Sequence, residues 1–229
     1  MAANAYAFPA TISRSPPKTT RKSMKKRPKQ QRVHTRPKRS VDDQAVKIIG
    51  GKLRRSTLIY DGNPRTRPMK NRTREAVFNL LGPTVEGMHA IDLFAGTGAL
   101  GLEAISRGAS RATFIERRVP TAKSVQQNIS MLAVEECCEV VVADTFFWVS
   151  QLNDLGTQPI LLFCSPPYEL YQKRSEEMIN LLSNLMEFAP PHSTFVVEAD
   201  NQFDFLQLPR ASEWDVRKYA PAIVALLSI

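Results

Sequence analysis

A glycine-rich segment near the middle of the chain constrains the fold more than any other feature. The short apolar run 89–94 precedes Gly96, Gly98 and Gly101, which have the spacing G-x-G-x-x-G and lead into a second apolar run, 99–107. This order predicts a strand, a tight turn and a helix, because glycine permits positive φ angles and a close approach of backbone to a ligand. The segment therefore indicates an α/β fold with a nucleotide-cofactor loop. A tight turn that binds no ligand is the alternative.

The sequence after this loop alternates between strand and helix patterns. Alternation of this kind predicts a mainly parallel sheet with ligands at the carboxyl ends of its strands. The expected strands are 89–94, 111–116, 140–144, 160–164 and 194–198, with a terminal antiparallel hairpin of 214–219 and 222–228. The expected helices are 99–107, 120–132, 145–152 and 175–188.

The segment before the loop has its own pattern. Residues 47–60 alternate around Gly50-Gly51, which predicts a β-hairpin of 47–50 and 53–60 followed by a turn at 61–64. Apolar residues at helical spacing predict a helix over 71–82, with Asn71 or Thr73 as its cap. We therefore expect an N-terminal extension made of a hairpin and a helix.

Polar residues stand at the ends of the expected strands. Asp92 ends the first strand and places a carboxylate beneath the glycine loop, where it would repel the pyrophosphate of a dinucleotide and favour a cationic or zwitterionic ligand. Glu116 lies twenty positions after Gly96, a spacing that suits a carboxylate binding two ribose hydroxyls and fits a dinucleotide equally well. S-adenosylmethionine, with its amino group, sulfonium and ribose, fits the acidic loop better than NAD does.

The expected strand 160–164 ends in Cys164-Ser165-Pro166-Pro167-Tyr168. Both prolines have a fixed φ and no amide proton, and the first pushes Ser165 toward an extended conformation. Such a stiff strand end could present oxygens to the amino protons of a flat ring while Tyr168 stacks on its face. Proline pairs that only end a strand are the alternative.

Two blocks upstream of the loop make a family resemblance specific. They are 47–54 (KIIGGKLR) and 72–81 (RTREAVFNLL). Together with the loop that starts at Asp92 and with Ser165-Pro166-Pro167-Tyr168, they resemble the bacterial 16S rRNA guanine-N2 methyltransferase family, RsmD, over roughly residues 46–229. The resemblance implies a Rossmann-like α/β fold, with helices on both faces of the sheet. It also implies methyl transfer from S-adenosyl-L-methionine to the exocyclic N2 amine of a guanine in small-subunit rRNA, free or in an assembling small ribosomal subunit.

Individual roles follow from the strand ends and the resemblance. The expected cofactor-binding residues are Asp92, Phe94, Ala95, Gly96, Gly98, Glu116, Arg117, Asp144 and Thr145. The expected catalytic residues are Ser165, Pro166, Pro167 and Tyr168. The expected RNA-binding residues are Arg54, Arg67, Arg72 and Arg74, of which the last three could instead close the cofactor pocket.

Several of these residues have a purely structural alternative. Asp92 could only cap the helix that follows it. Asp144 could cap the helix 145–152, a role that is compatible with accepting the adenine amino hydrogen. Glu116 could form a surface salt bridge with Arg117 or Arg118, and Tyr168 could pack at the rim of the site.

Ser165 departs from the family, whose members usually carry Asp at this place. A hydroxyl is a neutral and weaker acceptor than a carboxylate. Ser-Pro-Pro-Tyr also occurs among DNA amino-methyltransferases, so two other functions stay open. One is an amino-methyltransferase for adenine or cytosine in DNA or another RNA, and the other is a catalytically lapsed RNA-binding assembly factor.

Charge divides the chain unevenly. Residues 1–40 contain twelve Lys or Arg and no Asp or Glu, whereas the rest of the chain has 19 basic and 22 acidic residues. We expect a disordered basic tail over 1–45 that tethers RNA, an extension over 46–88, and a methyltransferase domain over 89–229. An organelle transit peptide at the start is the alternative for the first 15 residues.

The sequence gives little support for a metal-binding, disulfide-bonded or membrane protein. The three cysteines and three histidines show no metal-ligand or disulfide spacing, so no metal is expected. No run of about 18 apolar residues is present. We expect a cytoplasmic monomer that does not contact a membrane.

Overall fold

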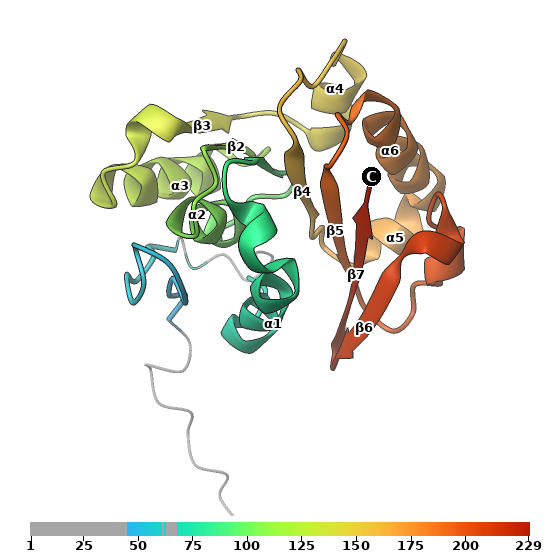
Figure 1. The fold of residues 1–229 in the computed structure, drawn as a ribbon, viewed down its shortest axis with the longest axis horizontal. Helices are drawn as coiled ribbons and strands as arrows, with labels where there is room; N and C mark the ends of the chain where they lie inside the picture. Colours follow the sequence, from blue (N-terminus) through green and yellow to red (C-terminus); the bar gives the residue numbers. More distant parts are fainter. Residues whose placement is uncertain (1–44, 61, 63–67) are drawn as a thin grey trace, which may run out of the picture. The chain divides into compact units, whose positions relative to one another are not determined.

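The described part of the chain is built on a seven-stranded sheet in the order β3-β2-β1-β4-β5-β7-β6. The computed structural model describes residues 45–60, 62 and 68–229 (Figure 1). Strands β1 to β5 are mutually parallel, and β7 runs antiparallel to both β5 and β6. The strands are β1 (His89–Asp92), β2 (Arg111–Ile115), β3 (Cys138–Val141), β4 (Ile160–Cys164), β5 (Thr194–Ala199), β6 (Asp215–Tyr219) and β7 (Ala222–Ser228). The predicted Rossmann-like sheet with its antiparallel C-terminal hairpin is confirmed.

Helices cover both faces of this sheet (Figure 1). They are α1 (Asn71–Leu81), α2 (Ala99–Ser106), α3 (Val119–Met131), α4 (Thr145–Ser150), α5 (Glu169–Lys173) and α6 (Ser175–Phe188). Short 3₁₀ helices are η2 (Gly82–Val85), η3 (Glu135–Cys137), η4 (Phe205–Gln207) and η5 (Ala211–Glu213). The sequence pattern missed α5 and these 3₁₀ turns, which are too short to show a helical period.

Strand β4 shows how the sheet separates two hydrophobic cores. Leu161 and Phe163 pack with the core of α1, α2 and α3, whereas Leu162 and Cys164 pack with the core of α4, α5 and α6. Successive side chains of a strand point to opposite faces, so a strand covered on both faces is apolar throughout. This burial explains the uninterrupted apolar run at 160–164.

The N-terminal extension forms only a short part of the predicted hairpin. Lys47 and Thr57 form an isolated antiparallel bridge. The backbone N–H of Ile48 donates to the Ser56 carbonyl at 2.9 Å and that of Leu58 to the Val46 carbonyl at 2.8 Å, but the paired segments are too short to count as strands. Helix α1 has Lys70 as its N-cap without a side-chain cap bond, so the predicted cap at Asn71 or Thr73 is wrong. Val46, Ile48 and Leu58 belong to the core beneath α1 and α2.

Two predictions for the start of the chain are not tested. The basic tail 1–45 lies, except for Ala45, outside the described residues, as do most residues of the turn 61–64. The domain division at residue 88 stays a prediction.

Candidate active site

The predicted site lies at the carboxyl edge of the parallel strands, where the strand order reverses. The chain proceeds outward from β1 through β2 to β3, and then returns to place β4 and β5 on the other side of β1. Ligands of open α/β sheets bind at this switch point, outside the carboxyl ends of the strands. Asp92, Glu116 and Ser165 stand at the ends of β1, β2 and β4.

The glycine loop joins β1 to α2 in the conformation that its sequence requires. Gly96 and Gly98 have φ angles of 52° and 75°. A Cβ on Gly101 would lie 2.4 Å from Cε1 of Phe114, so this glycine lets α2 pack closely on β2. The first two glycines thus shape the loop, and the third serves packing between helix and sheet.

Asp92 lies beneath this loop and is 1% exposed. Burial raises the pKa of its carboxyl from 3.8 to about 7, although backbone N–H groups of Gly101 and Phe94 favour the charged form. Its Oδ1 atom is buried without a hydrogen-bond partner among the described residues. A buried polar atom left unpaired calls for a ligand or water to satisfy it. An ammonium group such as that of a bound amino acid fits this oxygen.

Glu116 follows β2 and fastens the glycine loop. Its Oε2 accepts a hydrogen bond from the backbone N–H of Gly96 at 3.1 Å, and its Oε1 accepts one from the backbone N–H of Arg118 at 2.8 Å. The carboxylate therefore lies against the glycine loop, and its predicted binding of ribose hydroxyls stays a prediction. Arg117, the neighbouring residue, is exposed.

Asp144 follows β3 and is the N-cap of α4. Its Oδ1 accepts hydrogen bonds from the backbone N–H groups of Phe146 at 3.0 Å and Phe147 at 3.4 Å. Asp144 is therefore a helix cap, which was the structural alternative for this residue. The cap is compatible with binding of the adenine amino group, which stays a prediction. The hydroxyl of Thr145 donates to the carbonyl of Leu93, which ties α4 to the end of β1.

Aromatic rings stand beside this end of the sheet. Phe94 and Phe146 meet edge to face with centroids 6.4 Å apart. The guanidinium of Arg174 lies 3.7 Å from the centroid of Phe146. Ala95, which is also expected to bind cofactor, is buried, and its N–H donates to the carbonyl of Ile115 at 3.0 Å.

The diproline segment contacts a carboxylate that is not among the site residues predicted from the sequence. The hydroxyl of Ser165 donates to Oε2 of Glu198, and the Tyr168 hydroxyl donates to its Oε1 at 2.8 Å. Glu198 lies near the end of β5 and is 5% exposed. Burial raises the pKa of Glu198, and the bonds from Ser165 and Tyr168 lower it. The sequence does contain a signal for this residue, since Glu198 is the one charged residue in the mainly apolar strand β5.

The flanking residues of this segment complete its geometry. Pro166 is buried and Pro167 is exposed. The N–H of Leu170 donates to the Pro167 carbonyl at 2.9 Å, so the segment leads directly into α5. Cys164, expected to be a buried strand residue, is fully buried with its sulfur 3.8 Å from the Tyr171 hydroxyl.

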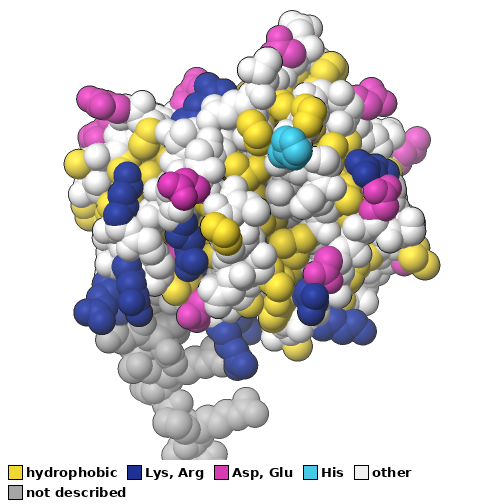
Figure 2. Space-filling view, viewed as in Figure 1, with side chains coloured by type: hydrophobic (Ala, Val, Ile, Leu, Met, Phe, Trp, Pro, Cys, Tyr) yellow, Lys and Arg dark blue, Asp and Glu magenta, His cyan; other side chains and the backbone are white. Residues whose placement is uncertain are grey.

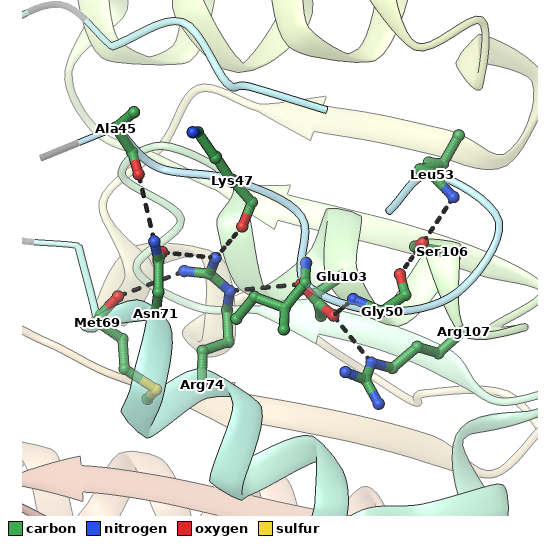
Figure 3. Close-up of polar contacts among 11 residues, drawn as sticks. Ala45, Lys47, Gly50, Leu53, Met69, Asn71, Arg74, Glu103, Ser106 and Arg107 are labelled. Carbon is green, nitrogen blue, oxygen red and sulfur yellow. Dashed lines mark hydrogen bonds and ion pairs between the residues drawn. The ribbon is translucent and has the colours of Figure 1, made fainter. Parts of the chain in front are cut away.

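The four arginines expected to bind RNA differ in their accessibility. Arg54 and Arg72 are exposed, and Arg67 lies outside the described residues. Arg74 is fully buried, so its predicted role as an RNA contact is wrong. Its guanidinium donates to the carbonyls of Lys47 and Met69 (Figure 3). In Figure 2 several basic side chains lie at the lower left, near the segment that Figure 1 draws in blue, and others are scattered over the rest of this face.

Figure 3 shows that Arg74 belongs to a buried cluster around Glu103 of α2. The Arg74 Nε atom lies 3.5 Å from Oε2 of Glu103, and both side chains are fully buried. Glu103 also accepts hydrogen bonds from the backbone N–H groups of Ile49 and Gly50 and from Nε of Arg107. This cluster fastens the N-terminal extension to the helix that follows the glycine loop.

Neither a metal centre nor a membrane helix is found in the described segments. They contain no group of three or more His, Cys, Asp or Glu able to hold a metal ion. Nor does any helix there have the length and apolar character needed to cross a bilayer.

A family model described as "Conserved hypothetical protein 95" matches residues 46–227. The chain belongs to this family. A relative within it, Ribosomal RNA small subunit methyltransferase D of Escherichia coli (strain K12), is 36% identical over 139 residues, which cover 61% of this chain and 67% of the relative. The RsmD resemblance expected from the sequence motifs is confirmed.

Solved structures agree with the membership of the Conserved hypothetical protein 95 family. The "Putative methyltransferase yhhF from Escherichia coli" superposes with a TM-score of 0.65 at 27% identity and covers 80% of this chain and 97% of its own. The T. thermophilus 16S rRNA N2 G1207 methyltransferase (RsmC), solved with AdoMet and guanosine, gives a TM-score of 0.62 at 17% identity over 80% of this chain and 49% of its own. At that identity the second likeness shows the fold alone.

Proposed function

We propose that this protein is a methyltransferase that transfers the methyl group of S-adenosyl-L-methionine to the N2 amine of a guanine in small-subunit rRNA. The observation that carries the proposal is the convergence of the Asp92 loop and the Ser165-Pro166-Pro167-Tyr168 segment at the switch point of the sheet. Membership of a family whose relatives are named rRNA methyltransferases supports the choice of reaction and substrate.

The residues of the loop and the neighbouring strand ends fit this cofactor. The unpaired Oδ1 of Asp92 is suited to an ammonium group. Glu116 would bind the ribose hydroxyls, and Asp144 would accept the adenine amino hydrogen beside the Phe94 and Phe146 rings. When bound, S-adenosyl-L-methionine supplies an electrophilic methyl group that an amine can accept without a covalent protein intermediate.

The diproline segment would hold the acceptor base. The N2 amine would donate to the Ser165 hydroxyl oxygen and the Pro166 carbonyl, while the Tyr168 ring stacks on the guanine. Stacking contributes about 1–3 kcal/mol per base in proteins that bind single strands. Catalysis by this segment is then mainly orientation and exclusion of water, and a paired base must first leave its stack.

Exposed basic residues supply contacts to the phosphate backbone. Arg54 and Arg72 are exposed on the extension, and residues 1–40 add twelve further basic residues to the chain. We propose that the protein acts as a cytoplasmic monomer on the assembling small subunit, with residues 89–229 as the methyltransferase domain.

Nucleoside mass spectrometry of rRNA tests the proposal. Small-subunit rRNA from a strain that lacks the protein should lose one N2-methylguanosine, and the purified protein should restore it in the presence of S-adenosyl-L-methionine. Restoration of N6-methyladenosine instead would contradict the guanine assignment.

The serine at position 165, where relatives usually carry Asp, supports a second candidate function. Because Ser-Pro-Pro-Tyr resembles the segment of DNA amino-methyltransferases, adenine or cytosine in DNA or another RNA is the competing acceptor. The same experiment, with genomic DNA and total RNA as substrates, separates the two. Calorimetry tests the lapsed alternative, since no binding of S-adenosyl-L-methionine at millimolar concentration would favour it.

A further inference from the structure

Glu198 lies beside the proposed acceptor site, at the end of the neighbouring strand. In the sheet register Cys164 of β4 pairs with Val197 of β5, so Ser165 and Glu198 are the next residues on two adjacent parallel strands. The strand ends therefore bring these side chains together, and Ser165 donates its hydroxyl proton to Oε2 of Glu198.

The surroundings of Glu198 are unusual for a buried carboxylate. Its side chain accepts from the neutral hydroxyls of Ser165 and Tyr168, and no ion pair of the described residues includes it. Buried carboxylates normally have a cationic partner, because an unpaired one loses the solvation of its charge. A protein keeps such a group at a strand end in an active site when the charge has a task there.

We infer that Glu198 is a positioning residue that makes the neutral Ser165 hydroxyl an effective acceptor for the guanine amine. A hydroxyl has one donor hydrogen and two acceptor lone pairs. Since its hydrogen is directed to Glu198, the Ser165 oxygen presents only lone pairs to the substrate. A hydrogen bond to a carboxylate also polarises the hydroxyl and strengthens what its oxygen accepts. The inference rests on the proposed function and names the group that completes its acceptor site.

The proton balance of methyl transfer gives Glu198 a second task. When the bond between N2 and the methyl carbon forms and the bond between carbon and sulfur breaks, the nitrogen gains a positive charge and must lose a proton. That proton passes to the Ser165 oxygen as the Ser165 proton passes to Glu198. The products are a neutral methylamine, a thioether, an unchanged serine and a protonated Glu198, which later releases its proton to water.

The sign of the pH dependence follows from this balance. Glu198 must be ionised to accept the proton, so the rate of transfer should fall as pH drops through its raised pKa. The other titratable groups near it are Tyr168, Tyr171, Cys164, Asp200 and, beyond Cys164, Asp92. The pKa values of the tyrosines and of Cys164 are raised, so these groups stay neutral at pH 5–8, whereas the pKa of Asp92 is raised to about 7 and lies within this range.

The experiment compares E198Q with the surface variant E187Q, because Glu187 is exposed on α6. We expect E198Q to lower kcat about ten- to a hundred-fold, with the calorimetric Kd for S-adenosyl-L-methionine within about two-fold of the unmodified protein. At saturating S-adenosyl-L-methionine, which keeps Asp92 occupied, its pH–rate profile should also lose the acid limb that the unmodified protein and E187Q share. Equal kcat values for E198Q and E187Q would overturn the inference.

A rescue variant separates this role from a structural one. S165D supplies a carboxylate directly to the amine, and the amide introduced by E198Q can donate to it, so S165D/E198Q should recover most of the lost kcat. S165D alone places two carboxylates in contact and should be slower than the double variant. If E198Q loses activity and S165D/E198Q recovers none, Glu198 serves packing only and the inference fails.

Two further readouts keep the test decisive. Should E198Q not fold, the unmodified protein still decides, because a rate that does not fall on the acid side of its pH profile overturns the inference. Total methyl incorporation is measured separately from the identity of the methylated nucleoside. A product other than N2-methylguanosine would therefore refute the proposed function, while the rescue would still report on Glu198.

Discussion

At the residue scale, Asp92 combines two properties that oppose each other. It is buried beneath the glycine loop, which makes its charge costly, and its Oδ1 has no partner within the described residues. Sites that bind a ligand often keep such a residue at the expense of stability, because the ligand offsets the cost when it binds. A substitution that removes the charge of Asp92 should therefore stabilise the unliganded protein and lower its affinity for the ligand.

We predict that D92N stabilises the unliganded protein and weakens cofactor binding. The raised pKa means that the folded state holds the Asp92 proton more tightly than the unfolded chain does. The free energy of unfolding therefore falls as pH rises from about 4 to about 7 and stays low above that. At about pH 8, D92N should unfold with a free energy higher by up to about 4 kcal/mol, and bind S-adenosyl-L-methionine about ten-fold more weakly.

Urea unfolding at about pH 5 and pH 8, with calorimetry at pH 8, checks both halves of this prediction. The gain in stability should be smaller at the lower pH. Unchanged cofactor affinity would contradict the ammonium-binding role of Asp92.

Some site residues could be predicted from the sequence and others could not, for a physical reason. Asp92, Glu116 and Ser165 each follow an apolar run directly, and the end of a parallel strand is where such a polar residue is tolerated. Glu198 was missed because its pairing with Ser165 depends on the register of two strands about 30 residues apart in sequence. Arg74 was misjudged because a local cluster of charge does not reveal a buried partner on another helix.

At the scale of elements, the Arg74–Glu103 cluster explains why the predicted hairpin forms only around the Lys47–Thr57 bridge. The N–H groups of Ile49 and Gly50 donate to Glu103, and that of Leu53 donates to the Ser106 hydroxyl. These N–H groups therefore donate to side chains of α2 and not to the carbonyl groups of a neighbouring strand. In contrast, β4 and α6 begin and end where their apolar patterns predicted, since their donors remain within the sheet and the helix.

We predict that R74M destabilises the fold without a specific effect on RNA, whereas R72M does the reverse. Removing one partner of a buried ion pair leaves the other uncompensated, so R74M should cost about 3–5 kcal/mol in the free energy of unfolding. Arg72 is exposed, so R72M should change that quantity by less than about 0.5 kcal/mol and lower rRNA affinity a few-fold. Chemical denaturation and filter binding measure the two effects. A stable R74M with weakened rRNA binding would show that Arg74 contacts RNA after all.

Gly51 gives a second test of the same contact between the extension and α2. It has a φ angle of 73°, and a Cβ built on it would lie 1.8 Å from the carbonyl oxygen of Ser106. G51A should therefore lower the free energy of unfolding by more than about 3 kcal/mol, because the extension must move off the helix.

Gly87 is the matched control for Gly51. Its φ is 77°, but a Cβ there would meet nothing within 4 Å. G87A should therefore cost only the strain of the backbone, about 1–2 kcal/mol. Thermal unfolding of both variants compares the two costs, and equal destabilisation would show that the close approach to Ser106 adds nothing.

At the scale of the whole molecule, charge is divided between two parts of the chain. The twelve basic residues of 1–40 exceed the net charge of +9 for the full sequence, so the remainder is slightly acidic. An acidic body would be repelled by rRNA, and the basic segment offsets this repulsion. Its contribution should be electrostatic and independent of sequence, because Lys and Arg without aromatic residues between them contact phosphates and not bases.

We predict that deletion of residues 1–40 weakens rRNA binding at low salt, and that this loss of affinity disappears at high salt. For every phosphate that the shortened protein no longer neutralises, the slope of log affinity against log salt should become shallower by about 0.7–0.9. At low salt the shortened protein should bind at least about ten-fold more weakly, and at high salt the two proteins should converge. The Kd for S-adenosyl-L-methionine and the methylated nucleoside should not change, because the residues proposed to bind both lie between Asp92 and Glu198. If deletion instead changes which nucleoside is methylated, the segment takes part in substrate selection, and the separation of tether from active site is wrong.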